Sequence, residues 1–516
     1  MNKIDWIFLL AYFVLIVWIG LSSCKKIKTS SDFFLAGRHF GWPIIGISIV
    51  ATQVSAITFI GAPSWSYQTG LKAIALFLNL PLVAWIASKT LIPYFYHLNI
   101  TSIYEYLQLR FGKNLKNILA LFYLIKTILI ASVIIYVPSL ILSRILSFPI
   151  EITICLIVLF ALLYTTLGGI RSVILSDGLQ LLIMWIGLAL LLFFLFLLLP
   201  LSPQESLSAL ITQNKLNALD FSFAFEAPNT VWAGIIGGGI IHLAYYGTEQ
   251  TQIQRILSAK NLKNARLSLY AGSVINLIQT FLFLVLGLGL YLFYQNNLSF
   301  SNPNDALISF VLQEIPQGVL GIFLVAIFAA TMSSIDSSIN SMTTVFMKDF
   351  FDPYLARFAK HNNPILIIRI VGVFLGLLIL LLALNLSQSQ MSILELITQY
   401  ASFILGSVLG VFLLGIFTQR SNENGAMIGF FAGIIGVIFA STLFNFFWMW
   451  NAPIGLMITL IVGYLSSLCF KTQTNHQLPK FHFSWKNLFD FDSLLLFLFC
   501  CAFFLFLWLL PSMHLG

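Results

Sequence analysis

Seven polar side chains between residues 333 and 341 interrupt the apolar stretch FLVAIFAATMSSIDSSINSMTTVFMKDF, residues 323–350. Ser333, Ser337 and Asn340 recur at helical spacing and share one helix face, with Asp336 alongside. A carboxylate in hydrocarbon is costly, and such groups usually mark ion or substrate pathways. Because hard cations prefer oxygen ligands, the stretch predicts a cation site inside a membrane helix. Hydrogen bonding of serines between helices is the structural alternative.

A second polar interruption lies in GISIVATQVSAITFIGAPSWSYQTG, residues 46–70. Its middle holds Thr52, Gln53, Ser55 and Thr58, followed by a glycine and a proline. Unwound backbone is tolerated in a membrane only around a cavity or a site. The stretch therefore predicts a broken helix whose freed carbonyls face a ligand, with a packing seam of small residues as the alternative.

Three charged residues lie inside other apolar stretches. Asp177 is either a functional acid or the ion-pair partner of Arg171. Lys126 either extends its ammonium group to the inner surface or faces a cavity and holds an anionic ligand. Glu249, near an inner helix end, is expected to pair with Arg255 or a neighbouring base.

Composition indicates what kind of fold positions these residues. The chain has 516 residues, of which 59% are hydrophobic and 9% charged, whereas about a quarter of a soluble globular chain is charged. This predicts an all-α polytopic membrane protein with about 14 transmembrane helices, each of about 20 residues. We expect them at 5–22, 43–69, 72–96, 118–146, 150–166, 172–200, 230–252, 267–294, 316–347, 364–386, 392–417, 424–443, 452–470 and 493–511.

The basic residues predict an orientation. With the N-terminus outside, most of the 26 lysines and arginines fall in cytoplasmic segments, as the positive-inside rule requires. We therefore expect a multi-pass protein of the cell membrane with both termini outside. The net charge of +8 then marks the cytoplasmic face and not a nucleic-acid surface. No soluble catalytic domain, HExxH motif or phosphate-binding glycine loop is present, so we do not expect an enzyme.

Four stretches carry a resemblance to a known family: DFFLAGRHFGWPIIGISIVATQVSAITFIG, TTLGGIRSVILSDGLQ, TEQTQIQRILSAKN and AATMSSIDSSINSMTTVFMKDF. In order and spacing they resemble the sodium/solute symporters over nearly the whole chain. The resemblance implies a single transporter domain, 1–516, with a leucine-transporter-like core of 5+5 inverted repeats. The repeats would be 43–200 and 230–417, with an extra helix at 5–22 and three more in 424–511.

The resemblance also implies sodium ligands. The common site of the family falls on Ala51, Val54, Ala330, Ser333 and Ser334. A second site, present in some members, falls on Asp177, Asp336 and Ser337. Asp336 departs from the family pattern because a hydroxyl often stands there. Its carboxylate could serve a second Na⁺, carry a proton or pair with a buried base, so one or two coupling Na⁺ ions are expected.

The solute is less closely defined. Sugar-type members carry Glu, Asn and Lys at the positions of Phe77, His242 and Asn276, which disfavours a sugar of that type. SAITF is similar to the monocarboxylate, vitamin and sialic acid branches, in which Ser55 and Thr58 would line the pocket. Lys126 would then neutralise a carboxylate. Further substrate-binding candidates are Gln53, Phe77, Asn79, His242, Tyr245, Asn276 and Gln399.

We thus expect a Na⁺-coupled secondary active symporter that imports a small, carboxylate-bearing organic solute by alternating access. The alternatives are a proton-coupled carrier in which Asp336 or Asp177 titrates, a Na⁺/sugar symporter (sialic acid included), and a membrane sensor that binds solute without transport. The expected partners are the solute, Na⁺ and the lipid bilayer, with no nucleic acid and no obligate protein partner.

Overall fold

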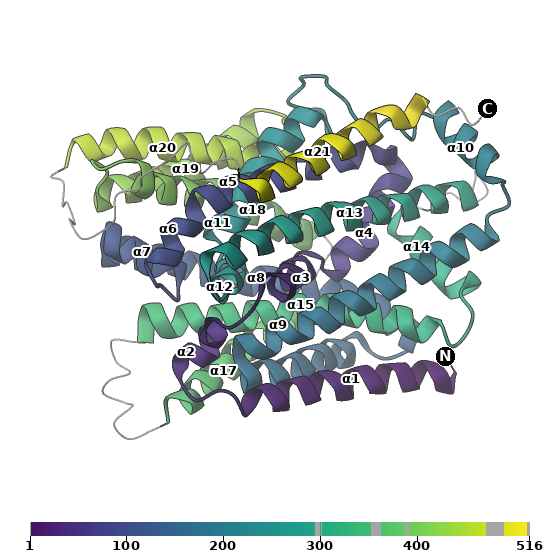
Figure 1. Cartoon of the computed structure of the whole chain (residues 1–516), viewed down its shortest axis with the longest axis horizontal. Helices are drawn as coiled ribbons and strands as arrows, with labels where there is room; N and C mark the ends of the chain where they lie inside the picture. Colours follow the sequence, from purple (N-terminus) through teal and green to yellow (C-terminus); the bar gives the residue numbers. More distant parts are fainter. Residues whose placement is uncertain are drawn as a thin grey trace.

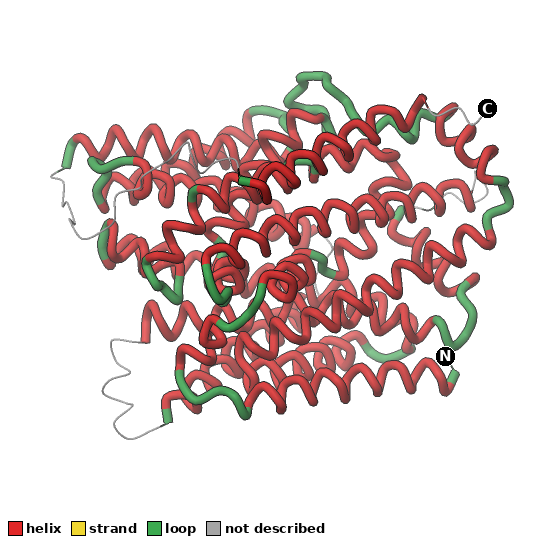
Figure 2. The backbone as a smooth tube through the Cα atoms, viewed as in Figure 1, coloured by secondary structure: helices red, strands yellow, loops and turns green. Residues whose placement is uncertain are grey.

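The chain folds into a bundle of helices that run side by side along one axis (Figure 1). The computed structural model describes residues 2–294, 300, 302–351, 363–386, 392–470 and 490–512, with backbone only at 137 and 392–401. Within these ranges the regular structure is entirely helical (Figure 2). The beginning of α1 (Lys3–Cys24) and the end of α21 (Phe491–Leu509) lie at the same end of the bundle (Figure 1).

The helices of the first half of the chain, after α1, are α2 (Ser30–Leu35), η1 (Ala36–Arg38), α3 (Trp42–Gln53), α4 (Ala56–Thr69), η2 (Gly70–Phe77), α5 (Leu80–Lys89), α6 (Leu91–His97), α7 (Ile103–Arg110), α8 (Lys113–Leu146), α9 (Ile150–Leu198) and α10 (Pro203–Thr212). Those of the second half, before α21, are η3 (Ala233–Gly238), α11 (Gly239–Thr248), α12 (Gln250–Leu257), α13 (Leu262–Tyr294), α14 (Asn304–Glu314), α15 (Leu320–Val345), η4 (Phe346–Phe351), α17 (Pro364–Leu386), α18 (Ser392–Phe417), α19 (Glu423–Leu443), η5 (Trp448–Trp450) and α20 (Asn451–Leu468). A short turn, η7 (Leu510–Ser512), follows α21.

The expectation of a polytopic, all-α membrane protein is confirmed. Among the described residues, ten helical segments are long and apolar enough to cross a membrane. Two of them, Ala56–His97 and Ile150–Leu198, each overlap two of the expected spans. Trp42–Gln53 and Ser402–Phe417 are apolar but shorter.

Spans 150–166 and 172–200, expected as separate helices, are the two arms of α9. They are separated by a kink at Gly169, whose φ of 54° and ψ of −156° are not helical. A Cβ atom at this position would lie 2.6 Å from the carbonyl oxygen of Phe33. Only glycine combines this backbone angle with so close a neighbour, so the sequence GG marks the boundary between the two expected spans.

The polar helix α15 lies in the middle of the bundle. It packs against α9, α8 and α1, and all of its residues except Ile322 are buried. Its serines and Asp336 therefore face protein and not lipid. This arrangement explains how an apolar segment tolerates them.

Close packing of α13 on α4 gives a prediction about stability. A Cβ atom at Gly287 of α13 would lie 2.0 Å from the carbonyl oxygen of Pro63, whereas one at Gly61 of α4 meets nothing within 4 Å. Overpacking costs about 1–3 kcal/mol. We therefore expect Gly287→Ala to lower the melting temperature in detergent and Gly61→Ala to leave it nearly unchanged. Equal melting of the two variants would contradict the packing of these helices.

Candidate functional site

The predicted break in the membrane segment 43–69 is present. Helix α3 ends at Gln53 and α4 begins at Ala56. Between them Val54 (φ −91°, ψ 97°) and Ser55 (φ −88°, ψ 170°) are extended. A helix end leaves its last carbonyls without intrahelical partners, and here that end lies buried inside the bundle. Freed backbone oxygens are thereby placed at the middle of the protein.

Serine side chains of α15 meet these freed carbonyls. The Ser333 hydroxyl donates to the carbonyl oxygens of Ala51 (3.0 Å) and Ala330 (3.1 Å), and the Ser334 hydroxyl lies 3.4 Å from the Ala330 carbonyl oxygen. Val54 is buried in the link between α3 and α4. The structure thus brings together four of the five residues of the first expected sodium site. The fifth, Val54, is three positions along the chain from Ala51.

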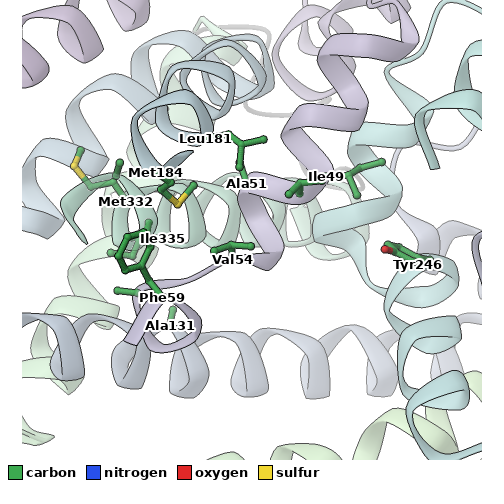
Figure 3. Packing of buried hydrophobic residues seen from close by; sticks show 14 of the residues in the cluster. Ile49, Ala51, Val54, Phe59, Ala131, Leu181, Met184, Tyr246, Met332 and Ile335 are labelled. Carbon is green, nitrogen blue, oxygen red and sulfur yellow. The ribbon is translucent and has the colours of Figure 1, made fainter. Parts of the chain in front are cut away.

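The apolar surroundings of the break are shown in Figure 3. Ala51 and Val54 lie near the end of α3, with Phe59 on the following helix. Met332 and Ile335 lie on α15 on either side of the two serines. On its other side Ser334 lines a cavity together with Thr52 and Ser338, so the oxygen atoms at the break lie between apolar packing and a polar cavity, which suits a monovalent cation that enters from water.

The three residues of the expected second cation site also lie together. Asp336 accepts hydrogen bonds from the hydroxyls of Tyr164 (2.6 Å) and Ser337 (3.1 Å). The Ser337 hydroxyl also contacts the guanidinium group of Arg255, which pairs with Asp177 at 3.1 Å. All five side chains are buried.

Arg255 is the ion-pair partner of Asp177, so the alternative in which Asp177 pairs with Arg171 is wrong. Arg255 also donates to Ser48 at 2.8 Å. Arg171 instead lies over the ring of Phe40. Two carboxylates and one guanidinium give this buried cluster, defined here as Asp177, Asp336 and Arg255 with their hydroxyl partners, a formal net charge of −1.

A cavity of about 480 Å³ opens beside the break. Of the ten substrate-binding candidates, eight line it: Gln53, Ser55, Thr58, Phe77, Lys126, His242, Tyr245 and Asn276. Asn79 does not line the cavity but is hydrogen-bonded to His242, which does. The side chain of Gln399 is outside the described residues. Thr280, Ser402 and Trp448 also line the cavity and were missed.

Lys126 and Glu249 form an ion pair at the cavity, so of the two expected partners of Glu249, Arg255 or a neighbouring base, the structure has a neighbouring base. Glu249 is the link between α11 and α12, where its backbone is extended (φ −86°, ψ 122°). The two side chains are each about 10% exposed. The ammonium of Lys126 therefore faces the cavity and does not extend to the inner surface.

Comparison with known proteins also indicates a sodium-coupled transporter. Residues 33–433 match the model of the sodium:solute symporter family. The sodium/sialic acid symporter NanT of Aliivibrio fischeri is 29% identical over 92% of this chain and 95% of its own length. Human sodium-coupled monocarboxylate transporter 1 is 30% identical over 79% of this chain and 67% of its own length. The human sodium/iodide cotransporter is 28% identical over 81% of this chain and 66% of its own length.

Solved structures agree. The substrate-bound outward-open state of a Na⁺-coupled sialic acid symporter superposes with a TM-score of 0.82 at 25% identity, over 91% of this chain and 99% of that one. MHP1, a nucleobase-cation-symport-1 family transporter, superposes with a TM-score of 0.56 at 10% identity, which shows the fold alone. The relatives are transporters and not enzymes. With the family match covering most of its length, this multi-pass membrane chain belongs to the sodium:solute symporter family.

Proposed function

We propose that this chain imports a small, carboxylate-bearing organic solute together with Na⁺ by alternating access. The observation that carries the proposal is the contact of Ser333 with the freed carbonyl of Ala51 across two helices, directly beside a cavity of about 480 Å³. Na⁺ bound between Ala51, Val54, Ala330, Ser333 and Ser334 would hold α3 against α15. Solute binding beside it would then permit closure and inward release.

We further propose fourteen spans around two inverted repeats of five, 43–200 and 230–417. The break between α3 and α4 and the break at Glu249 between α11 and α12 support this, because each lies in the first span of its repeat. The cytoplasmic placement of most basic residues supports both termini outside in the cell membrane.

The coupling energy follows from the ion. Moving one charge through 100 mV is worth about 2.3 kcal/mol, and a tenfold Na⁺ gradient adds about 1.4 kcal/mol. A second ion would double both contributions, so the stoichiometry sets how steep a solute gradient the protein maintains.

Uptake into proteoliposomes tests the proposal. Vesicles are given an inward Na⁺ gradient, an equal K⁺ gradient or an inward proton gradient, and lactate, nicotinate and sialic acid are offered as labelled solutes. We expect Na⁺-dependent accumulation of at least one acid. Accumulation driven by protons in the absence of Na⁺ would replace this proposal with the second candidate below.

Lys126 is proposed to hold the solute carboxylate, which would take the place of Glu249 as its partner. A hydrogen bond to a charged group is worth about 1.5–3 kcal/mol. We therefore expect Lys126→Met to raise the solute concentration for half-maximal uptake about 10- to 100-fold. Glu249→Gln, the matched control, removes the competing carboxylate and is expected not to raise it. Unchanged uptake by Lys126→Met would remove this lysine from the solute site.

A proton-coupled carrier is the second candidate. The buried cluster favours it. Among the described residues, the hydrogen-bond partners of Asp336 are all hydroxyl groups, while Arg255 forms its ion pair with Asp177. The remaining negative charge needs a proton or a second cation. Asp336→Asn separates the cases: unchanged uptake at every pH and Na⁺ concentration would assign neither a proton nor a second Na⁺ to this residue.

A further inference from the structure

Asn79 is held in one orientation by backbone carbonyls. Its amide nitrogen donates to the carbonyl oxygens of Leu76 (2.7 Å) and Gly234 (2.9 Å). Only the NH₂ group of an amide donates hydrogen bonds. The amide oxygen is therefore fixed on the other side, and it lies 2.7 Å from Nδ1 of His242. The side chain is almost fully buried, so water does not compete for these groups.

Glycines make this arrangement possible. A Cβ atom at Gly234 would lie 2.0 Å from the carbonyl oxygen of Ala75, and one at Gly238 would lie 2.7 Å from the amide nitrogen of Asn79. The run AGIIGGG, residues 233–239, thus lets η3 approach η2 closely and the start of α11 approach Asn79 and α5. The network is built into the packing of two segments far apart in the sequence.

The orientation of Asn79 fixes the tautomer of His242. An amide oxygen accepts hydrogen bonds only, so Nδ1 of His242 must carry the hydrogen. In a neutral imidazole the other nitrogen, Nε2, is then a hydrogen-bond acceptor. No carboxylate hydrogen-bonds to the ring among the described residues, so the imidazolium form has no counter-charge there.

The ring lines the cavity with its face tilted against Phe77, at a distance of 6.1 Å between ring centroids. Within the described part of the chain, Asn79 is its hydrogen-bonding side-chain partner through Nδ1. A ligand in the cavity would therefore meet an acceptor at Nε2. An unpaired acceptor disfavours a solute that presents only acceptors or apolar groups there.

We propose that His242 is a specificity-determining acceptor and that the solute is a hydroxycarboxylic acid, whose hydroxyl donates to Nε2. The carboxylate half of this inference rests on the proposed function, through Lys126. A hydroxyl needs only the neutral acceptor at Nε2, whereas an ammonium group would need a counter-charge there, and no carboxylate hydrogen-bonds to the ring among the described residues.

The test is competition against Na⁺-dependent uptake in proteoliposomes. Three matched pairs of acids are used: lactate and propionate, phenyllactate and phenylpropionate, gluconate and hexanoate. Each acid is also offered as the labelled solute. In the wild-type protein we expect at least one hydroxy acid to compete at a concentration about tenfold lower than its partner, the effect of one hydrogen bond.

Two variants assign the preference to His242. His242→Phe keeps a ring beside Phe77 but removes the acceptor, and it is expected to abolish the difference within the pair. His242→Gln supplies an amide oxygen and is expected to restore part of it. Equal competition by both members of every pair in the wild-type protein would overturn this inference and leave the symport proposal intact. Failure of all six acids to enter with Na⁺ would overturn the inference together with the carboxylate part of the proposed function.

Discussion

Replacing Arg255 with methionine is expected to lower the free energy of unfolding by about 3–5 kcal/mol, because it leaves a buried carboxylate without its counter-charge. Arg255 is about 1% exposed, and its guanidinium contacts Asp177, Ser48 and Ser337. The loss is measured by denaturant unfolding of the purified protein in detergent micelles.

Two further variants show whether the ion pair is the cause. The double variant Arg255→Met with Asp177→Asn removes both charges of the pair and is expected to recover most of the lost stability. Arg171→Met removes an arginine that lies over Phe40, outside the cluster, and is expected to change stability much less. A larger loss in Arg171→Met than in Arg255→Met would contradict the pairing that the structure assigns to Asp177.

Replacing both Ser333 and Ser334 with alanine is expected to raise the Na⁺ concentration for half-maximal uptake about 100-fold or more. Each hydroxyl is proposed as a ligand, and an interaction with a charged group is worth about 1.5–3 kcal/mol. Initial rates of uptake are measured over a range of Na⁺ concentrations, with choline as the replacement cation.

Thr343→Val is the matched control on the same helix. Its buried hydroxyl donates to the carbonyl oxygen of Ile339, one turn earlier in α15, and valine keeps the shape of the side chain. We expect its Na⁺ dependence to equal that of the wild-type protein. An unaltered Na⁺ requirement in the double serine variant would exclude these hydroxyls as ligands.

The positions of the membrane segments were largely predictable from sequence, since apolar length and helical spacing are local properties. Helix α17 has the expected bounds, 364–386, and the break in 43–69 lies within the polar residues that indicated it. The boundary between the expected spans 150–166 and 172–200 is also present, at Gly169, although a glycine pair indicates a loop and a kink equally well and does not fix the form of the break.

The partners of the buried charges were not predictable. Spacing tells which face of a helix carries a residue, but not which helix that face meets. Asp177 and Arg255 are 78 positions apart, and Lys126 and Glu249 are 123 positions apart. Tyr164, which donates to Asp336, lies in an apolar stretch and has no sequence feature that separates it from an ordinary core aromatic. The proposal that the carbonyls of Ala51 and Ala330 are sodium ligands came from the family resemblance alone, because no side chain marks a backbone oxygen.

The most direct test of the account is the entry of ²²Na⁺ driven by solute. Proteoliposomes carry either the wild-type protein or the Ser333→Ala/Ser334→Ala variant, and an inward gradient of the transported acid is imposed without a Na⁺ gradient. We expect the acid to draw ²²Na⁺ into wild-type vesicles at a fixed ratio, and little ²²Na⁺ into vesicles with the variant at the same Na⁺ concentration. Solute entry without accompanying ²²Na⁺ in the wild-type protein would contradict Na⁺-coupled symport through this site.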